Sequence, residues 1–98
     1  PVVTYILHHH EKWDGTGYPE GLKQEDIPLE SRILSIAADY DSYMTDRIRQ
    51  KVPLTAMQAL EKMRSERGTR YDPELFDLFE KMIKSNIDEY KISACMGD

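Results

Sequence analysis

Three consecutive histidines followed by a glutamate, His8 to Glu11, are the side chains of this chain best suited to binding a metal ion. Imidazole and carboxylate are ligands that suit iron and manganese. Apolar residues at spacings of three and four predict a helix near residues 1–13, and neighbouring helical side chains diverge by about 100°. At most two of the imidazoles would then serve one site, from its two sides. The run alone is a weak signal, because a solvated helix end or an expression tag has the same pattern.

A loop of about fifteen residues follows, because residues 14–28 contain three of the five glycines and two of the five prolines. Loops of this length in small domains are usually functional or disordered. Glycines permit positive φ angles and close approach of the backbone to a ligand, and the Tyr18 ring is suited to stacking on a guanine or hydrogen-bonding a phosphate. The loop is therefore a candidate binding segment.

The segment from His9 to Pro19 resembles the signature HHExxDGxGYP of the HD-GYP family of cyclic di-GMP phosphodiesterases, and every fixed position matches. The resemblance covers about residues 1–83 and includes residues 27–28, 32–33, 36–37 and 72–74. An eleven-position motif with matching downstream residues is very specific. The chain resembles the C-terminal half of such a domain over residues 1–84, and residues 85–98 are expected to form a weakly structured tail or one more helical turn.

The resemblance implies an all-α, HD-type helical domain with a cluster of iron or manganese ions that activates a hydroxide on a phosphodiester. It implies that His9 and His10 are metal ligands, whereas His8 matches no fixed position. The groups that activate the catalytic step are expected in an N-terminal half that lies outside this chain. The residues implied in substrate binding are Gly17, Tyr18, Pro19 and Arg47.

Two departures from the family pattern limit the expected chemistry. The family has an aspartate ligand where this chain has Ala38, so Asp39 or Asp41 would have to replace it. The His-Asp pair that names the fold lies upstream in the family, and no histidine precedes Tyr5 here. With two secure ligands, this chain alone is expected to bind the metal cluster weakly or not at all and to be inactive.

Two functions are consistent with these observations. The first is a bacterial second-messenger signalling enzyme whose full-length parent hydrolyses cyclic di-GMP. The alternative is a degenerate or truncated, non-catalytic HD-GYP module that binds cyclic di-GMP or a diguanylate-cyclase domain through the Tyr18 loop.

Four helices are needed to position these residues, and the apolar period places them near residues 1–13, 29–46, 55–66 and 73–84. Thr55 with Gln58 forms a capping box at the third, and Asp72-Pro73 is typical of the first turn of the fourth. The helix faces that carry Ile6, His9, Ile36 and Tyr40 would lack cover in this chain. We therefore expect self-association.

Composition excludes several classes of partner. A net charge of −5 gives no basic field for a nucleic-acid polymer or an anionic membrane surface. The single cysteine cannot form an internal disulfide, which fits the cytoplasm. At 98 residues the chain has room for one small core and no second catalytic lobe.

Overall fold

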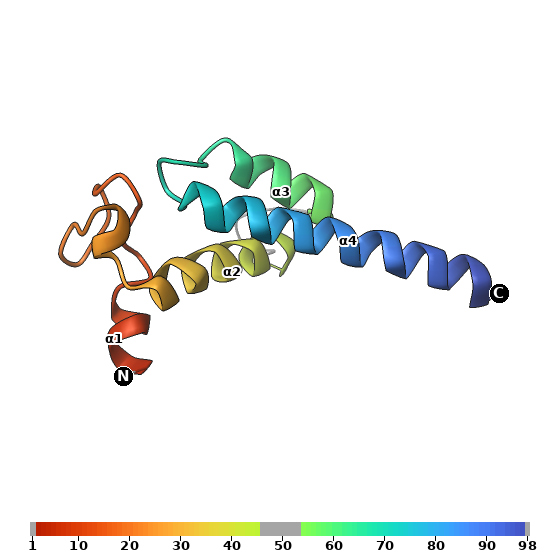
Figure 1. Cartoon of the computed structure of the whole chain (residues 1–98), viewed down its shortest axis with the longest axis horizontal. Coiled ribbons are helices and arrows are strands. Elements are labelled where there is room, and N and C mark those ends of the chain that lie inside the picture. The colour runs from red at the N-terminus through yellow and green to blue at the C-terminus, as the bar shows by residue number, and fades with distance from the viewer. Residues whose placement is uncertain (1, 46–53, 98) are drawn as a thin grey trace.

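The structure, a computed structural model, describes residues 2–45 and 54–97. Its elements in chain order are α1 (Val2–Leu7), the 3₁₀ turn η1 (Gln24–Asp26), α2 (Leu29–Thr45), α3 (Ala56–Arg64) and α4 (Pro73–Gly97). Helix α2 contacts each of the other three helices, and α3 also contacts α4 (Figure 1). The described residues contain no strand, only an isolated bridge between Arg67 and Tyr71. The prediction of an all-α domain is therefore confirmed.

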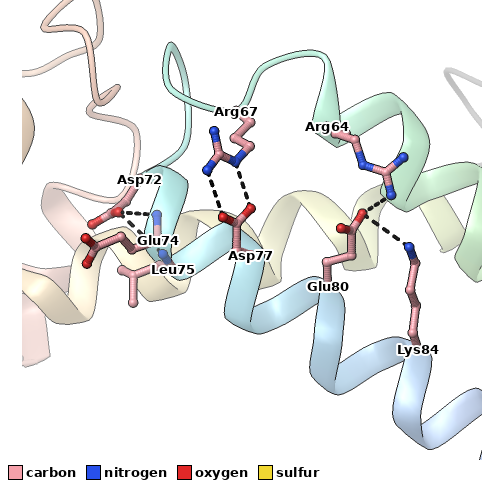
Figure 2. Close-up of polar contacts among 8 residues, drawn as sticks. All are labelled: Arg64, Arg67, Asp72, Glu74, Leu75, Asp77, Glu80 and Lys84. Atoms are coloured by element: carbon pink, nitrogen blue, oxygen red, sulfur yellow. Dashed lines mark hydrogen bonds and ion pairs between the residues drawn. The ribbon is translucent and has the colours of Figure 1, made fainter.

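The predicted starts of the last two helices are confirmed by their caps. The Thr55 hydroxyl accepts a hydrogen bond from the Gln58 N–H at 3.2 Å, and the Gln58 side chain accepts one from the Thr55 N–H at 3.0 Å. The Asp72 carboxylate accepts hydrogen bonds from the N–H groups of Glu74 and Leu75 at 3.0 and 3.4 Å (Figure 2). Each cap satisfies backbone donors that the first helical turn leaves without partners.

Two helix ends differ from the prediction. Helix α1 ends at Leu7 rather than near residue 13, because Glu11 turns inward and binds the backbone of the following loop. Helix α4 continues to Gly97 rather than ending near residue 84. No proline follows Pro73, and Gly97 is the first glycine after Gly68, so nothing local stops the helix. The prediction that the fourth helix ends near residue 84 is therefore wrong.

The core lies where α2, α3 and α4 meet. Its buried residues are Ile36, Met63, Tyr71 and Phe76, with Tyr40, Tyr43, Leu75 and Phe79 packed around them. Because α3 and α4 cover Ile36 and most of Tyr40, the expectation that this face lacks cover is wrong there. Ile6, in contrast, is 52% exposed, as expected.

Ion pairs join the end of α3 and the turn that follows it to α4, and one more lies within α4. Arg67 makes two contacts of 2.7 Å with Asp77, and Glu80 pairs with Arg64 and, at 3.9 Å, with Lys84 (Figure 2). These groups are largely exposed or only partly buried, so they add little stability. Within residues 2–45 and 54–97, no helix has both the length and the apolar character needed to cross a bilayer.

A more buried ion pair fixes the exit of the loop. Arg32 Nη1 lies 2.7 Å from Asp72 Oδ2, and the two side chains are only 15% and 6% exposed. Arg32 Nε also donates a hydrogen bond of 3.0 Å to the carbonyl of Ile27, the residue that caps the C-terminal end of η1. One guanidinium therefore joins the end of the loop, the start of α2 and the capped start of α4.

Candidate functional site

Glu11 binds the backbone of the loop of residues 14–28, called the signature loop below, from its buried side. Its side chain is buried, and its two carboxylate oxygens accept hydrogen bonds of 3.0 Å from the N–H groups of Glu20 and Leu22. His8 Nδ1 lies 3.2 Å from the same carboxylate. Burial by itself would raise the pKa of Glu11, but the hydrogen bonds from Glu20, His8 and Leu22 outweigh it and lower the pKa below its ordinary value. Glu11 is therefore a buried anion that holds the far side of the loop.

The other side of the loop is held by the turn that precedes α4. The Trp13 N–H donates to the carbonyl of Arg70 at 3.2 Å, and the Asp14 N–H donates to the carbonyl of Thr69 at 2.9 Å. Asp14 then closes its own turn by accepting hydrogen bonds from the hydroxyl and N–H of Thr16, at 2.6 and 3.1 Å, which lower the pKa of Asp14. Residues 13–14 thus dock on residues 69–70, more than fifty positions away in the sequence.

Gly17 lies against the backbone of the segment that carries the histidines. A Cβ at Gly17 would meet the carbonyl oxygen of His10, and would lie 2.5 Å from Lys12 N and 2.7 Å from Glu11 Cα. Side chains cannot approach backbone atoms so closely, so only glycine fits. The next residue, Tyr18, is 61% exposed, and its peptide bond to Pro19 is cis.

His9 and His10 lie side by side rather than splayed. Because α1 ends at Leu7, both lie in a turn, with ring centroids 3.9 Å apart. The expectation of imidazoles diverging by 100° on a helix is therefore wrong. The His10 ring in turn stacks on Tyr18, with centroids 5.0 Å apart and planes 20° apart. The histidines and Tyr18 of the loop thus form one continuous surface.

Imidazole is a ligand type that suits iron and manganese. His9 Nδ1 lies 2.5 Å from the carbonyl oxygen of Ile6, a hydrogen bond that orients the His9 ring. Desolvation, followed by the proximity of His9, lowers the pKa of His10 and favours its neutral form. Neutral imidazole is the form that binds metal ions. The two rings therefore fit a metal site in their chemistry.

The carboxylates predicted as alternatives occupy different surroundings. Asp39 accepts a hydrogen bond of 2.7 Å from the Tyr71 hydroxyl and pairs with Arg70 Nε at 2.9 Å. Asp41 is exposed, and Ala38 carries no donor atom. Among the described residues, no three histidine, cysteine, aspartate or glutamate side chains are grouped so as to hold an ion. A complete metal site would thus need further ligands. Arg47 lies outside the described residues.

The sequence pattern did not indicate two of the residues that build this site. Arg70 and Tyr71 connect α2 to the loop, but they lie in a short turn without periodicity. The buried role of Glu11 was also missed, although its position in the signature was recognised. The available signal was the acidic residue that follows His9 and His10 and precedes the glycine-rich loop.

Comparison with known proteins gives consistent findings. Residues 1–75 match the family described as HD domain. A cyclic di-GMP phosphodiesterase of Thermotoga maritima is 39% identical over 85 residues, which cover 87% of this chain and 23% of the relative. A probable cyclic di-GMP phosphodiesterase of Vibrio cholerae is 44% identical over 71 residues, or 72% of this chain and 16% of the relative.

Among solved structures, a cyclic GMP-AMP-specific phosphodiesterase of Vibrio cholerae superposes with a TM-score of 0.73 at 30% identity. The match covers 85% of this chain and 18% of that protein. This chain therefore spans less than a quarter of the length of each of these three relatives.

Proposed function

This chain belongs to the HD domain family and is of its HD-GYP type, and we propose that it is part of a bacterial, cytoplasmic phosphodiesterase that hydrolyses cyclic di-GMP. The observation that carries the proposal is the continuous surface formed by His9, His10 and Tyr18. It places two imidazoles, of which the pKa of His10 is lowered, beside an exposed aromatic ring on a loop whose backbone is fixed from both sides. Such a surface suits a substrate that combines flat bases with phosphates.

His9 and His10 would hold iron or manganese, together with ligands from outside the described residues. When bound, such a divalent cluster lowers the pKa of a water molecule and stabilises the attacking and leaving oxygens of a phosphodiester. Tyr18 would stack on a guanine or hydrogen-bond a phosphate, and Gly17 and Pro19 would shape the loop beside it. Arg47 is proposed to clamp a phosphate, because its planar guanidinium matches two phosphate oxygens.

The test uses the full-length parent protein loaded with iron or manganese. We expect cleavage of cyclic di-GMP, and we expect His9→Ala and His10→Ala each to abolish it. The control is Glu61→Gln, an exposed residue of α3 away from the loop, which should retain the parental rate. Absence of turnover in the metal-loaded parent would refute the phosphodiesterase proposal. Binding of cyclic di-GMP without turnover would instead establish the non-catalytic module, which the alanine at position 38 favours.

We also propose that this chain self-associates. The exposed apolar side chains of α1, α2 and α4 include Val2, Ile6, Ile33, Leu78 and Met82. Removing such side chains from water is favourable by about 25 cal/mol for each Å². Light scattering of the 98-residue chain should give a mass above the 11.4 kDa monomer, and a strictly monomeric mass at high concentration would refute this. A diguanylate-cyclase domain remains a proposed partner of the Tyr18 loop.

A further inference from the structure

We propose that Asp39 is the anchor that holds the signature loop against α2, and that it is a positioning residue rather than a metal ligand. The anchor consists of Asp39 on α2 together with Arg70 and Tyr71 in the turn before α4. This role can be tested without any reaction, because it concerns the position of the loop and the protection of the Trp13 and Asp14 amides from hydrogen exchange.

The first step is the contact between α2 and the turn. Asp39 Oδ2 accepts the Tyr71 hydroxyl at 2.7 Å and lies 2.9 Å from Arg70 Nε, while Arg70 Nη2 lies 3.5 Å from Oδ1. Tyr71 is 1% exposed, and burial followed by the hydrogen bond to Asp39 raises the pKa of its hydroxyl, which stays a donor. Hydrogen bonds to a charged group in such surroundings are among the stronger ones in proteins.

The second step is the contact between the turn and the loop. The carbonyls of Thr69 and Arg70 accept the N–H groups of Asp14 and Trp13. Residue 14 is three positions before Gly17 and four before Tyr18. The position of the loop relative to α2 is therefore set through one partly buried carboxylate and three consecutive residues of the turn, 69–71.

The same contacts make Asp39 a poor ligand. Both of its oxygens face donors, and its nearest cation is a guanidinium that is always charged. A divalent ion on this carboxylate would lie beside that guanidinium and would be repelled by it. Helix α2 is continuous from Leu29 to Thr45, so it shows no shift of register that would turn Asp39 toward the position of Ala38.

The first experiment measures amide hydrogen exchange in the 98-residue chain. In Asp39→Asn and in Tyr71→Phe, the amides of Trp13 and Asp14 should exchange about tenfold to a hundredfold faster, as expected from losing a hydrogen bond or ion pair of a charged group. The Ala59 amide, which donates to the Thr55 carbonyl in α3, should be unchanged and so exclude global unfolding.

Two further readouts accompany the exchange rates. Trp13 is the only tryptophan, and it lies beside Arg32 and Asp72 in a partly polar pocket, so its fluorescence should change in the same variants. The matched control is Asp41→Asn, which removes the same charge from an exposed position on the same helix and should alter neither readout. Unchanged exchange of Trp13 and Asp14 in both anchor variants would overturn the proposal.

The second experiment separates anchoring from metal binding in the full-length parent. Asp39→Asn and Tyr71→Phe should leave the manganese affinity within about twofold. A fall of tenfold or more in Asp39→Asn, with Tyr71→Phe unaffected, would make Asp39 a ligand and overturn the proposal. One further expectation rests on the proposed function: both variants should raise KM for cyclic di-GMP more than they lower kcat. If the parent does not hydrolyse cyclic di-GMP, the exchange measurements, which use no substrate, still decide whether Asp39 is the anchor.

Discussion

Replacing Glu11 with glutamine should undock the signature loop although the side chain keeps its shape. Each carboxylate oxygen accepts one backbone N–H, from Glu20 and from Leu22. A glutamine offers one oxygen, so its NH₂ group would face the second N–H, donor against donor. Losing a charged acceptor costs about 1.5 to 3 kcal/mol, and leaving a buried donor unpaired costs about 1 to 3 kcal/mol. We expect a total near 3 kcal/mol, or about a hundredfold in the docking equilibrium.

Amide hydrogen exchange of Glu20 and Leu22 measures this equilibrium directly, and both amides should exchange about a hundredfold faster in Glu11→Gln. The control is Glu20→Gln, which changes an exposed acid of the same loop and leaves its backbone donor in place. If the Glu20 and Leu22 amides of Glu11→Gln exchange within twofold of their rates in the unsubstituted chain, the loop is held by other contacts. The reasoning from Glu11 would then be wrong.

The same carboxylate should make loop docking sensitive to acid. The folded structure lowers the pKa of Glu11 below its ordinary value of 4.5. The ionised carboxylate therefore stabilises the docked loop fully at pH values above 4.5, and this stabilisation is lost as the pH falls through the lower pKa of the folded state. Trp13 fluorescence should therefore change below about pH 4.5 in the unsubstituted chain. The change should be absent in Glu11→Gln, and its persistence there would assign it to another group.

Three further predictions follow from other contacts. Gly17→Ala should disturb the stacking of Tyr18 on His10, because its Cβ meets only backbone atoms; we expect a loss of about 1 to 3 kcal/mol in loop stability, and unchanged Trp13 fluorescence and exchange would contradict it. Arg32→Met should lower the free energy of unfolding by about 3 kcal/mol in urea, because it leaves a buried partner charge uncompensated, whereas Arg67→Met, in an exposed pair, should change it far less. Ala38→Asp should raise the manganese affinity of the full-length parent by more than the 10- to 100-fold typical of residues around a metal site, and unchanged metal content would show that this position lies away from the metals.

The sequence determined the features whose causes lie within a few residues. The capping box at Thr55 and the capped start at Asp72 were predicted and found, because a cap joins residues only two or three positions apart. The central helix was predicted over residues 29–46 and is found at Leu29–Thr45, because its apolar period reflects one buried face. The signature of the loop was also readable from residue types alone.

The tertiary structure decided what those residues do. The sequence placed His9 and His10 on a helix, but the inward turn of Glu11 ends α1 early and brings their rings together. It left Asp39 as an alternative ligand, whereas a tyrosine 32 positions away binds its carboxylate. Trp13 and Arg70 are 57 positions apart, yet their backbones are hydrogen-bonded. Such contacts depend on where α2 and the turn before α4 pack, and packing follows from the burial of Ile36, Met63, Tyr71 and Phe76 together rather than from any local pattern.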